Sequence, residues 1–216
     1  ELFSHEKTGE SFERTIFEVA ERCGWNIYAY VIMSNHYHLA IETPESNLVE
    51  GMKWLQSTFA TRFNRLRNER GHVFQGRYKS ILINEDRPLL GLIDYIHLNP
   101  VRANLCTVDD LKGYGLSSFP KYFKRTIRTP LDRGTLLSLC SLPDTLAGMR
   151  KYQKHLELCD ERNPRKRNEL SKKYCLGWHL GSAKAKKTLA KDLAESTPAV
   201  NWEGVDLKEL NECNWE

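Results

Sequence analysis

Two histidines separated by a single residue, His36 and His38, are the side chains of this chain best suited to bind a metal ion. They open an apolar run typical of a β-strand, in which alternate side chains lie on the same face. Both imidazoles are therefore expected to point the same way, while Tyr37 points into a core. Two neighbouring imidazoles can bind one divalent metal ion, although an isolated His-x-His pair is more often two ordinary strand histidines.

A second segment, residues 94–103, places a tyrosine and an asparagine four positions apart at the end of a helix-like run. Residues at this spacing are neighbours on one helix face, so Tyr95 and Asn99 are expected to lie side by side. Pro100 disfavours helical geometry at Asn99 and predicts that the helix ends there. If this helix end packs against the histidine face, two imidazole nitrogens, an amide oxygen and a phenol come together.

Phosphoryl transfer is the reaction that such a group of side chains favours. A tyrosine hydroxyl has a pKa of about 10 and is a poor nucleophile at neutral pH. A divalent ion on the target phosphate would withdraw charge from phosphorus and stabilise the leaving oxygen, and little else is required for this chemistry. We therefore predict Tyr95 as the nucleophile. The predicted ligands of Mg²⁺ or Mn²⁺ are His36, His38 and Asn99.

These motifs resemble those of a known family. His36-Tyr37-His38 is similar to the His–hydrophobic–His motif of single-strand DNA transposases, and residues 95–103 resemble the helix that carries their tyrosine. Residues 74–79 resemble the segment that lies between the histidine motif and the tyrosine helix in that family. The pattern is most similar to the REP-associated tyrosine transposases, domesticated relatives of the insertion-sequence enzymes. Asn99 stands where the insertion-sequence relatives have glutamine, which suits the domesticated group.

The resemblance implies a ferredoxin-like α+β fold, in which helices pack on one antiparallel sheet. It also implies cleavage and rejoining of single-stranded DNA beside a palindromic hairpin, through a 5′-phosphotyrosine intermediate. Insertion-sequence relatives are dimers that exchange tyrosine helices, whereas domesticated relatives resemble monomers, so a monomer and a homodimer both remain open. Family members begin with a strand and a basic glycine turn, and neither is visible before Ser11.

The hydrophobic pattern predicts a layered α+β domain over residues 1–120 and a mainly helical extension over residues 121–216. In the first part we expect Ser11 and Asn47 to cap helices and the two strands around the histidines to form a hairpin. The extension could hold DNA or pack on the core. The expected helices cover residues 9–23, 47–67, 87–99, 144–158 (capped by Asp144), 182–194 and 206–212, and the expected strands cover 25–33, 36–43 and 77–83.

The charge distribution permits a nucleic-acid partner. The formal net charge is +4 and the pI is about 8.7, and basic residues gather in residues 53–79 and again in residues 162–191, where they could neutralise phosphates. Arg62 and Arg65 are expected to lie off the buried stripe of their helix. Trp54 and Phe74 could stack on bases but fit a core better. The predicted DNA contacts are Arg62, Arg65, Arg67, Arg77, Tyr78, Lys79 and Arg102.

Several classes of protein do not fit the sequence. The six cysteines form no CxxC pair, which argues against a cysteine zinc site and against a disulfide-rich secreted scaffold. No apolar run approaches the ~20 residues of a membrane span, and no signal peptide is visible. A cytoplasmic, nucleoid-associated protein is expected, although the chain begins at Glu1 without a methionine and leaves an upstream segment open.

Two other functions remain open. The chain could be a former transposase that grips hairpin nucleic acid without cutting it, but the presence of Tyr95 together with both histidines and Asn99 argues against that. It could also be a phosphoesterase that uses water as its nucleophile, but the several carboxylates that usually bind Mg²⁺ are not apparent.

Overall fold

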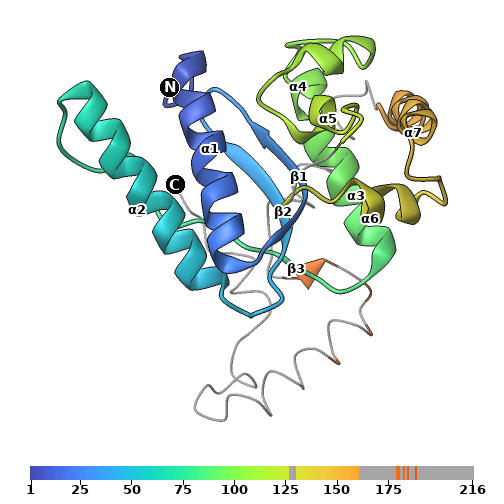
Figure 1. The fold of residues 1–216 in the computed structure, drawn as a ribbon, viewed down its shortest axis with the longest axis horizontal. Helices are drawn as coiled ribbons and strands as arrows, with labels where there is room; N and C mark the ends of the chain where they lie inside the picture. Colours follow the sequence, from blue (N-terminus) through green and yellow to red (C-terminus); the bar gives the residue numbers. More distant parts are fainter. Residues whose placement is uncertain (127–129, 161–178, 181, 183, 185–187, 189–216) are drawn as a thin grey trace.

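A β-hairpin forms the centre of the structure, a computed structural model that describes residues 1–126, 130–160, 179, 180, 182, 184 and 188. Strands β1 (Asn26–Ile32) and β2 (Tyr37–Glu42) pair antiparallel, as predicted. Helices α1 (Glu6–Cys23) and α2 (Leu48–Arg67) lie on one side of the hairpin, and α3 (Asp86–His97) lies on the other (Figure 1). The α+β class is therefore confirmed.

Alternation along the hairpin divides the side chains between two hydrophobic clusters. Ile32 and Tyr37 pack with α1 and α2, whereas Val31 and Ala40 pack with α3. Because successive strand residues point to opposite faces, the face that carries Ala40 also carries His38. Tyr37 thus points into a core, as the sequence predicts, and the histidine face is turned toward the tyrosine helix.

Helix α1 follows its predicted apolar stripe, with Phe12, Ile16 and Val19 fully buried. It ends at Gly24, which has φ 67° and provides the left-handed cap expected of glycine. The predicted start at Gly9 and the predicted cap at Ser11 are wrong, because the helix already begins at Glu6. Phe3 packs its ring 4.9 Å from Phe12 and so holds the preceding turn against the core.

Helix α2 begins directly after Asn47, as predicted, but the Asn47 side chain does not cap it. Its Oδ1 accepts a hydrogen bond of 2.7 Å from Nε1 of Trp25, and its Nδ2 donates to the carbonyl of Cys23. Gly51, one turn into α2, lies against the Trp25 ring so closely that a Cβ atom would collide with it. Trp25, which is buried, therefore fixes where α2 meets β1.

The predicted tyrosine helix is present as α3, followed by the short α4 (Asn99–Arg102). Pro100 lies in the first turn of α4, where a missing N–H costs nothing. The chain thus interrupts the helix at Leu98, one residue before the predicted end. Ile93 and Ile96 form the buried face that packs on the hairpin.

The predicted strand over residues 77–83 is wrong for most of its length. Only β3 (Leu82–Ile83) is extended in a sheet, and it pairs in parallel with β4 (His179–Leu180). Within the described residues the main sheet has two strands, so the larger ferredoxin-like sheet is not formed there. The outer edge of β1 is bonded instead to loops, where Ile27 N donates to the carbonyl of Pro130 and Ile32 N to that of Leu116.

Residues 121–160, the continuous described part of the predicted extension apart from residues 127–129, are mainly helical and pack on α3, in the same hydrophobic cluster. Thr145, not Asp144, caps the last helix, because its hydroxyl accepts from Gly148 N while Asp144 pairs with Arg133. The predicted boundary at residue 120 falls within α5, and the division into two domains stays a prediction. The extension contains α6 (Arg133–Leu139) and α7 (Leu146–Cys159), and it is preceded by the 3₁₀ helix η1 (Asp109–Gly113) and by α5 (Ser118–Lys121).

The remaining predictions for the extension lie outside the described residues. They are the helix over residues 206–212, nearly all of the helix over residues 182–194, and most of the basic stretch over residues 162–191. Among the residues that the structure describes, no helix has the length and apolar character needed to cross a bilayer.

Candidate active site

Side chains from the hairpin and from the α3–α4 junction meet on the histidine face. The rings of His36 and His38 have their centroids 5.0 Å apart, and the His38 ring lies 5.4 Å from the ring of Tyr95. The Asn99 side chain lies close enough to His36 to raise the pKa of its imidazole. The structure therefore brings together all four residues that the sequence selects for the nucleophile and the metal ligands.

The orientation of the Asn99 amide follows from the end of the tyrosine helix. Its Nδ2 donates a hydrogen bond of 3.1 Å to the backbone carbonyl of Tyr95. Since the amide nitrogen is occupied in this way, the amide oxygen is left to face His36. Asn99 is buried, so this orientation is held by its surroundings.

The two histidines are neutral at physiological pH. The pKa of His38 is lowered to about 4. Burial is the larger cause of this shift, and the neighbouring His36 is the smaller one. Burial also lowers the pKa of His36, although the Asn99 side chain, which can accept a hydrogen bond from the protonated ring, opposes the effect. Neutral imidazoles keep a lone pair for a metal ion, so the donor set fits a divalent cation.

Asn35 orients His36 through the other ring nitrogen. Nδ1 of His36 lies 2.7 Å from the Asn35 Oδ1, and when Nδ1–H donates to that oxygen the lone pair lies on Nε2. Partners of this kind fix the tautomer of metal-binding histidines. No sequence pattern singles out Asn35, because the partner of a ring nitrogen is visible only in three dimensions.

Arg102 lies against the tyrosine. Its guanidinium carbon is 4.8 Å from the centroid of the Tyr95 ring, and its NH1 donates a hydrogen bond of 3.1 Å to the Tyr95 carbonyl. Tyr95 itself is only 4% exposed. Arg102 was expected to contact DNA, and the structure adds a second role for it in holding the ring of Tyr95.

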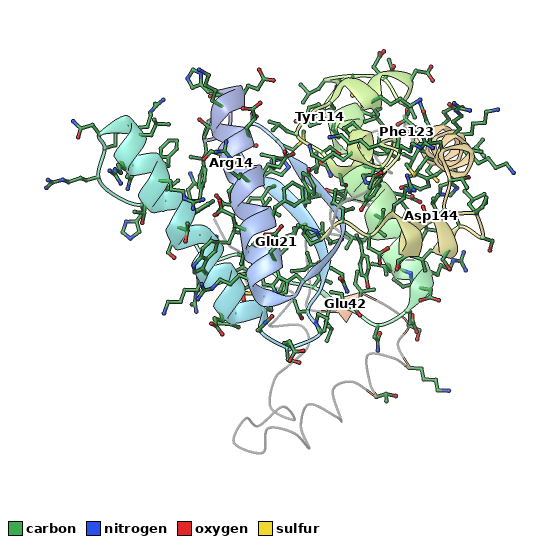
Figure 2. The ribbon with its side chains drawn as sticks, in the orientation of Figure 1. Arg14, Glu21, Glu42, Tyr114, Phe123 and Asp144 are labelled. Carbon is green, nitrogen blue, oxygen red and sulfur yellow. The ribbon has the colours of Figure 1, made fainter. Side chains whose placement is uncertain are left out.

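Two polar residues near the motifs lie outside this group. Glu42 is at the end of β2 (Figure 2), where its carboxylate accepts hydrogen bonds from Asn26 Nδ2 (2.8 Å) and the Tyr28 hydroxyl (2.9 Å). His97 is fully buried, 3.0 Å from the hydroxyl of Tyr152 and 2.9 Å from that of Ser118. Neither side chain is directed at the histidine pair.

The predicted DNA contacts differ in their availability. Arg65, Arg77 and Lys79 are exposed. Arg62 is engaged within the protein, because its NH1 lies 2.7 Å from Glu18 Oε2 and also donates to the Thr15 hydroxyl. Arg67 is partly engaged, because it pairs with Glu69 and stacks on Phe63. Tyr78 is also partly engaged, because it packs beside the α1–α2 cluster, as do Trp54 and Phe74.

Comparisons with known proteins bear on this group of residues. Residues 1–99 match the model of the family described as "Transposase IS200 like". A protein of Haemophilus influenzae named "Putative REP-associated tyrosine transposase" is 26% identical over 127 residues, which are 54% of this chain and 71% of that relative. No solved structure gives a significant match. His36, His38, Tyr95 and Asn99 all lie in the matched region, and the resemblance drawn from the motifs is confirmed.

Proposed function

We propose that this chain is a divalent-metal-dependent transesterase that cleaves and rejoins single-stranded DNA, because residues 1–99 match the model of the IS200-like transposase family. The family supports a role in DNA transposition and a DNA partner. Our proposal adds that Tyr95 is the nucleophile, that His36, His38 and Asn99 hold Mg²⁺ or Mn²⁺, and that the DNA carries a hairpin.

The observation that carries the proposal is the contact between the histidine pair and the α3–α4 junction. His38 and Tyr95 are 57 positions apart in the sequence, yet their rings lie 5.4 Å apart. Asn99, which begins α4, reaches His36 in the same place. Packing for stability alone would favour apolar side chains at this junction, whereas the residues here are two imidazoles, an amide and a phenol.

The donor set of two neutral imidazoles and one amide oxygen suits a divalent cation but brings no negative charge of its own. A phosphate of the substrate would therefore complete the site. When bound, the cation would polarise the scissile phosphate and lower the barrier to attack. Imidazole ligands favour Mn²⁺, whereas Mg²⁺ suits the oxygen donors.

In the reaction that we propose, Tyr95 Oη forms a bond to phosphorus while the bond from phosphorus to the 3′ oxygen breaks. The phenol proton leaves to solvent, and the departing oxygen takes up a proton to become a 3′-hydroxyl. The products are a 5′-phosphotyrosine and a free 3′ end. One phosphodiester bond replaces another, so a second 3′-hydroxyl can reverse the step and join strands without added energy.

Arg102 is the residue of this chain that would assist Tyr95. A guanidinium beside a phenol favours the negative charge that develops on its oxygen during attack. The same side chain also fixes the tyrosine backbone through its hydrogen bond to the carbonyl. Arg65, Arg77 and Lys79 are exposed and would hold the phosphates of the incoming strand.

Cleavage of a labelled hairpin oligonucleotide tests the proposal. The protein is incubated with the DNA and Mn²⁺ or Mg²⁺, and covalent adducts and free 3′ ends are measured on denaturing gels. Tyr95→Phe and His36→Ala are the test variants. Tyr28→Phe and His72→Ala are matched controls, because Tyr28 bonds Glu42 away from the site and His72 is exposed.

We expect the wild type and both controls to form an adduct that Tyr95→Phe and His36→Ala lack. Tight binding by the wild type without cleavage would favour the hairpin-binding module. Cleavage that survives Tyr95→Phe would favour hydrolysis by water.

A further inference from the structure

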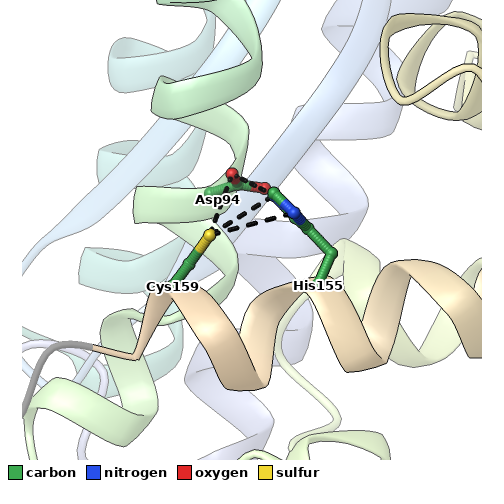
Figure 3. Close-up of side chains that lie close together, drawn as sticks. All are labelled: Asp94, His155 and Cys159. Atoms are coloured by element: carbon green, nitrogen blue, oxygen red, sulfur yellow. Dashed lines mark hydrogen bonds and ion pairs between the residues drawn. The ribbon is translucent and has the colours of Figure 1, made fainter.

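Three potential metal ligands meet on the far side of the tyrosine helix, away from its hairpin face. Asp94 comes from α3, and His155 and Cys159 come from α7 (Figure 3). Their nearest ligand atoms all lie within 4.8 Å of one another. His155 and Cys159 are four positions apart on a helix, a spacing that places both side chains on one face.

The distances within this group are close to those around a tetrahedral zinc ion. Usual zinc–ligand bond lengths place two ligand atoms about 3.3 Å apart for nitrogen and oxygen and about 3.5 Å apart when one is sulfur. In the structure, His155 Nε2 lies 2.8 Å from Asp94 Oδ2, Cys159 Sγ lies 3.4 Å from His155 Nε2, and Cys159 Sγ lies 3.9 Å from Asp94 Oδ2. Shifts of about half an ångström would therefore suffice.

The surroundings of the group support an ion rather than a loose surface contact. The Asp94 side chain is 11% exposed and that of His155 is 37% exposed. The second oxygen of Asp94 accepts a hydrogen bond of 2.9 Å from the Tyr152 hydroxyl, which is the type of partner that orients a metal-binding carboxylate. Tyr152 is fully buried, so its hydrogen bond fixes the orientation of the Asp94 carboxylate.

We propose that Asp94, His155 and Cys159 bind a zinc ion that fastens α7 to the tyrosine helix. The combination of thiolate, imidazole and carboxylate suits Zn²⁺, whereas Mg²⁺ prefers oxygen ligands alone. A zinc site with three protein ligands takes water as its fourth ligand.

This ion would have a structural role. Asp94 directly precedes Tyr95, so a ligand at this position ties the backbone beside the proposed nucleophile to α7. The site is separate from the proposed catalytic metal and has a different ligand set, since His36, His38 and Asn99 include no sulfur. Zinc binding at this site therefore does not depend on the proposed reaction.

The competing interpretation is a hydrogen-bonded group without metal. A protonated His155 would pair with Asp94, and the Cys159 thiol would donate to the same carboxylate. Such a group would also connect α7 to α3, but it would bind no ion with its sulfur. A direct readout of metal–thiolate bonding separates the two interpretations.

The test uses the full chain, stripped with a chelator under reducing conditions and titrated with Co²⁺, which occupies zinc sites and absorbs strongly when bound to a thiolate. Cys159→Ser and His155→Ala are the test variants. Cys106→Ser is the control, because Cys106 is a partly buried thiol outside the group. The thermal midpoint of each protein is measured with and without Zn²⁺.

We expect one equivalent of Co²⁺ to give a thiolate charge-transfer band in the wild type and in Cys106→Ser, and Zn²⁺ to displace it. The band should be lost in Cys159→Ser and at least tenfold weaker at the same Co²⁺ concentration in His155→Ala. Zn²⁺ should raise the midpoint of the wild type and of the control only. Absence of the band from the wild type, a band in Cys159→Ser, or a band in His155→Ala that is less than tenfold weaker than in the wild type would overturn the proposal.

Discussion

At the scale of single residues, the end of the tyrosine helix organises the candidate site. The last carbonyl groups of a helix have no partner within the helix, and that of Tyr95 accepts from both Asn99 Nδ2 and Arg102 NH1. Satisfying this carbonyl turns the Asn99 oxygen toward His36 and lays the Arg102 guanidinium over the Tyr95 ring. The positions of the proposed ligand and of the neighbouring cation therefore follow from the way the helix ends.

Because His97 is buried, we expect the stability of the protein to decrease as the pH is lowered. Burial lowers its pKa to about 3, whereas in the unfolded chain the value is about 6.5. Between these values the unfolded state binds a proton that the folded state excludes, so stability is fully present above pH 6.5 and falls as the pH is lowered. This residue contributes up to about 1.4 kcal/mol per pH unit.

Urea unfolding of the wild type and of His97→Gln at several pH values between 7 and 4 measures this effect. The variant should be less stable at pH 7, because it loses its bonds to Tyr152 and Ser118. Its stability should nevertheless fall less steeply with decreasing pH, because about one proton fewer is taken up on unfolding. Parallel pH profiles for the two proteins would show that His97 is not excluded from protonation in the folded state.

The arginines of α2 should differ in their effect on DNA binding. Arg65 is exposed, so we expect Arg65→Ala to weaken binding of single-stranded DNA and to reduce the slope of log K against log salt concentration by about 0.7. Arg62 is paired with Glu18, and Arg62→Ala should leave that slope nearly unchanged. Fluorescence anisotropy at several salt concentrations gives both slopes, and equal slopes for the two variants would contradict this assignment.

At the scale of the elements, contact between Trp25 and Gly51 sets how α2 lies on the hairpin. Gly51→Ala would force a methyl group into the indole ring, and overpacking of this kind typically costs about 1–3 kcal/mol. Denaturant unfolding should show that loss, whereas Gly113→Ala should have little effect, because nothing lies near a Cβ at that position. A Gly51→Ala protein as stable as the wild type would mean that Trp25 can move without cost.

How far the sequence predicts the elements depends on whether their signals are local. The alternation around His36 and His38 and the stripe through Phe12 and Ile16 are properties of single segments, and both predictions are confirmed. The strand over residues 77–83 fails because a strand needs a partner, and only Leu82–Ile83 finds one. The predicted start at Gly9, with Ser11 as cap, fails for a related reason, since Phe3 packs on Phe12 through a contact outside the helix and α1 begins at Glu6.

The candidate site was predictable because each half has its own local pattern: a His-x-His pair on a strand, and a tyrosine four residues before an asparagine on a helix. The orienting roles of Asn35 and Arg102 were not predictable, because they depend on contacts made after folding. The group around Asp94 was also missed. Its aspartate and histidine are 61 positions apart, so a search for CxxC pairs could not find it.

At the scale of the whole molecule, the tyrosine helix lies between the hairpin and the helices that follow it. Ile93 of α3 shares one cluster with Val31 of β1 and with Leu137 and Tyr152 of α6 and α7. The appended helices thus help to position Tyr95, the proposed nucleophile. This arrangement argues that the described residues on either side of residue 120 depend on each other for stability.

A shared core predicts a single unfolding transition. Leu137 is fully buried, and Leu137→Ala should cost about 2–5 kcal/mol. Fluorescence of the tryptophans, of which Trp25 lies in the α1–α2 cluster, should report the same shifted midpoint as far-ultraviolet circular dichroism. If tryptophan fluorescence kept the wild-type midpoint while circular dichroism shifted, residues 121–160 would be a separate unit.

The attachment site of cleaved DNA tests the central claim most directly. A covalent adduct formed on a single-stranded hairpin substrate is digested with nuclease and protease, and the modified peptide is sequenced by mass spectrometry. We predict a nucleotide joined through its 5′ phosphate to Tyr95. Attachment to any other residue, or cleavage with no attached nucleotide, would contradict the assignment of Tyr95 as the nucleophile.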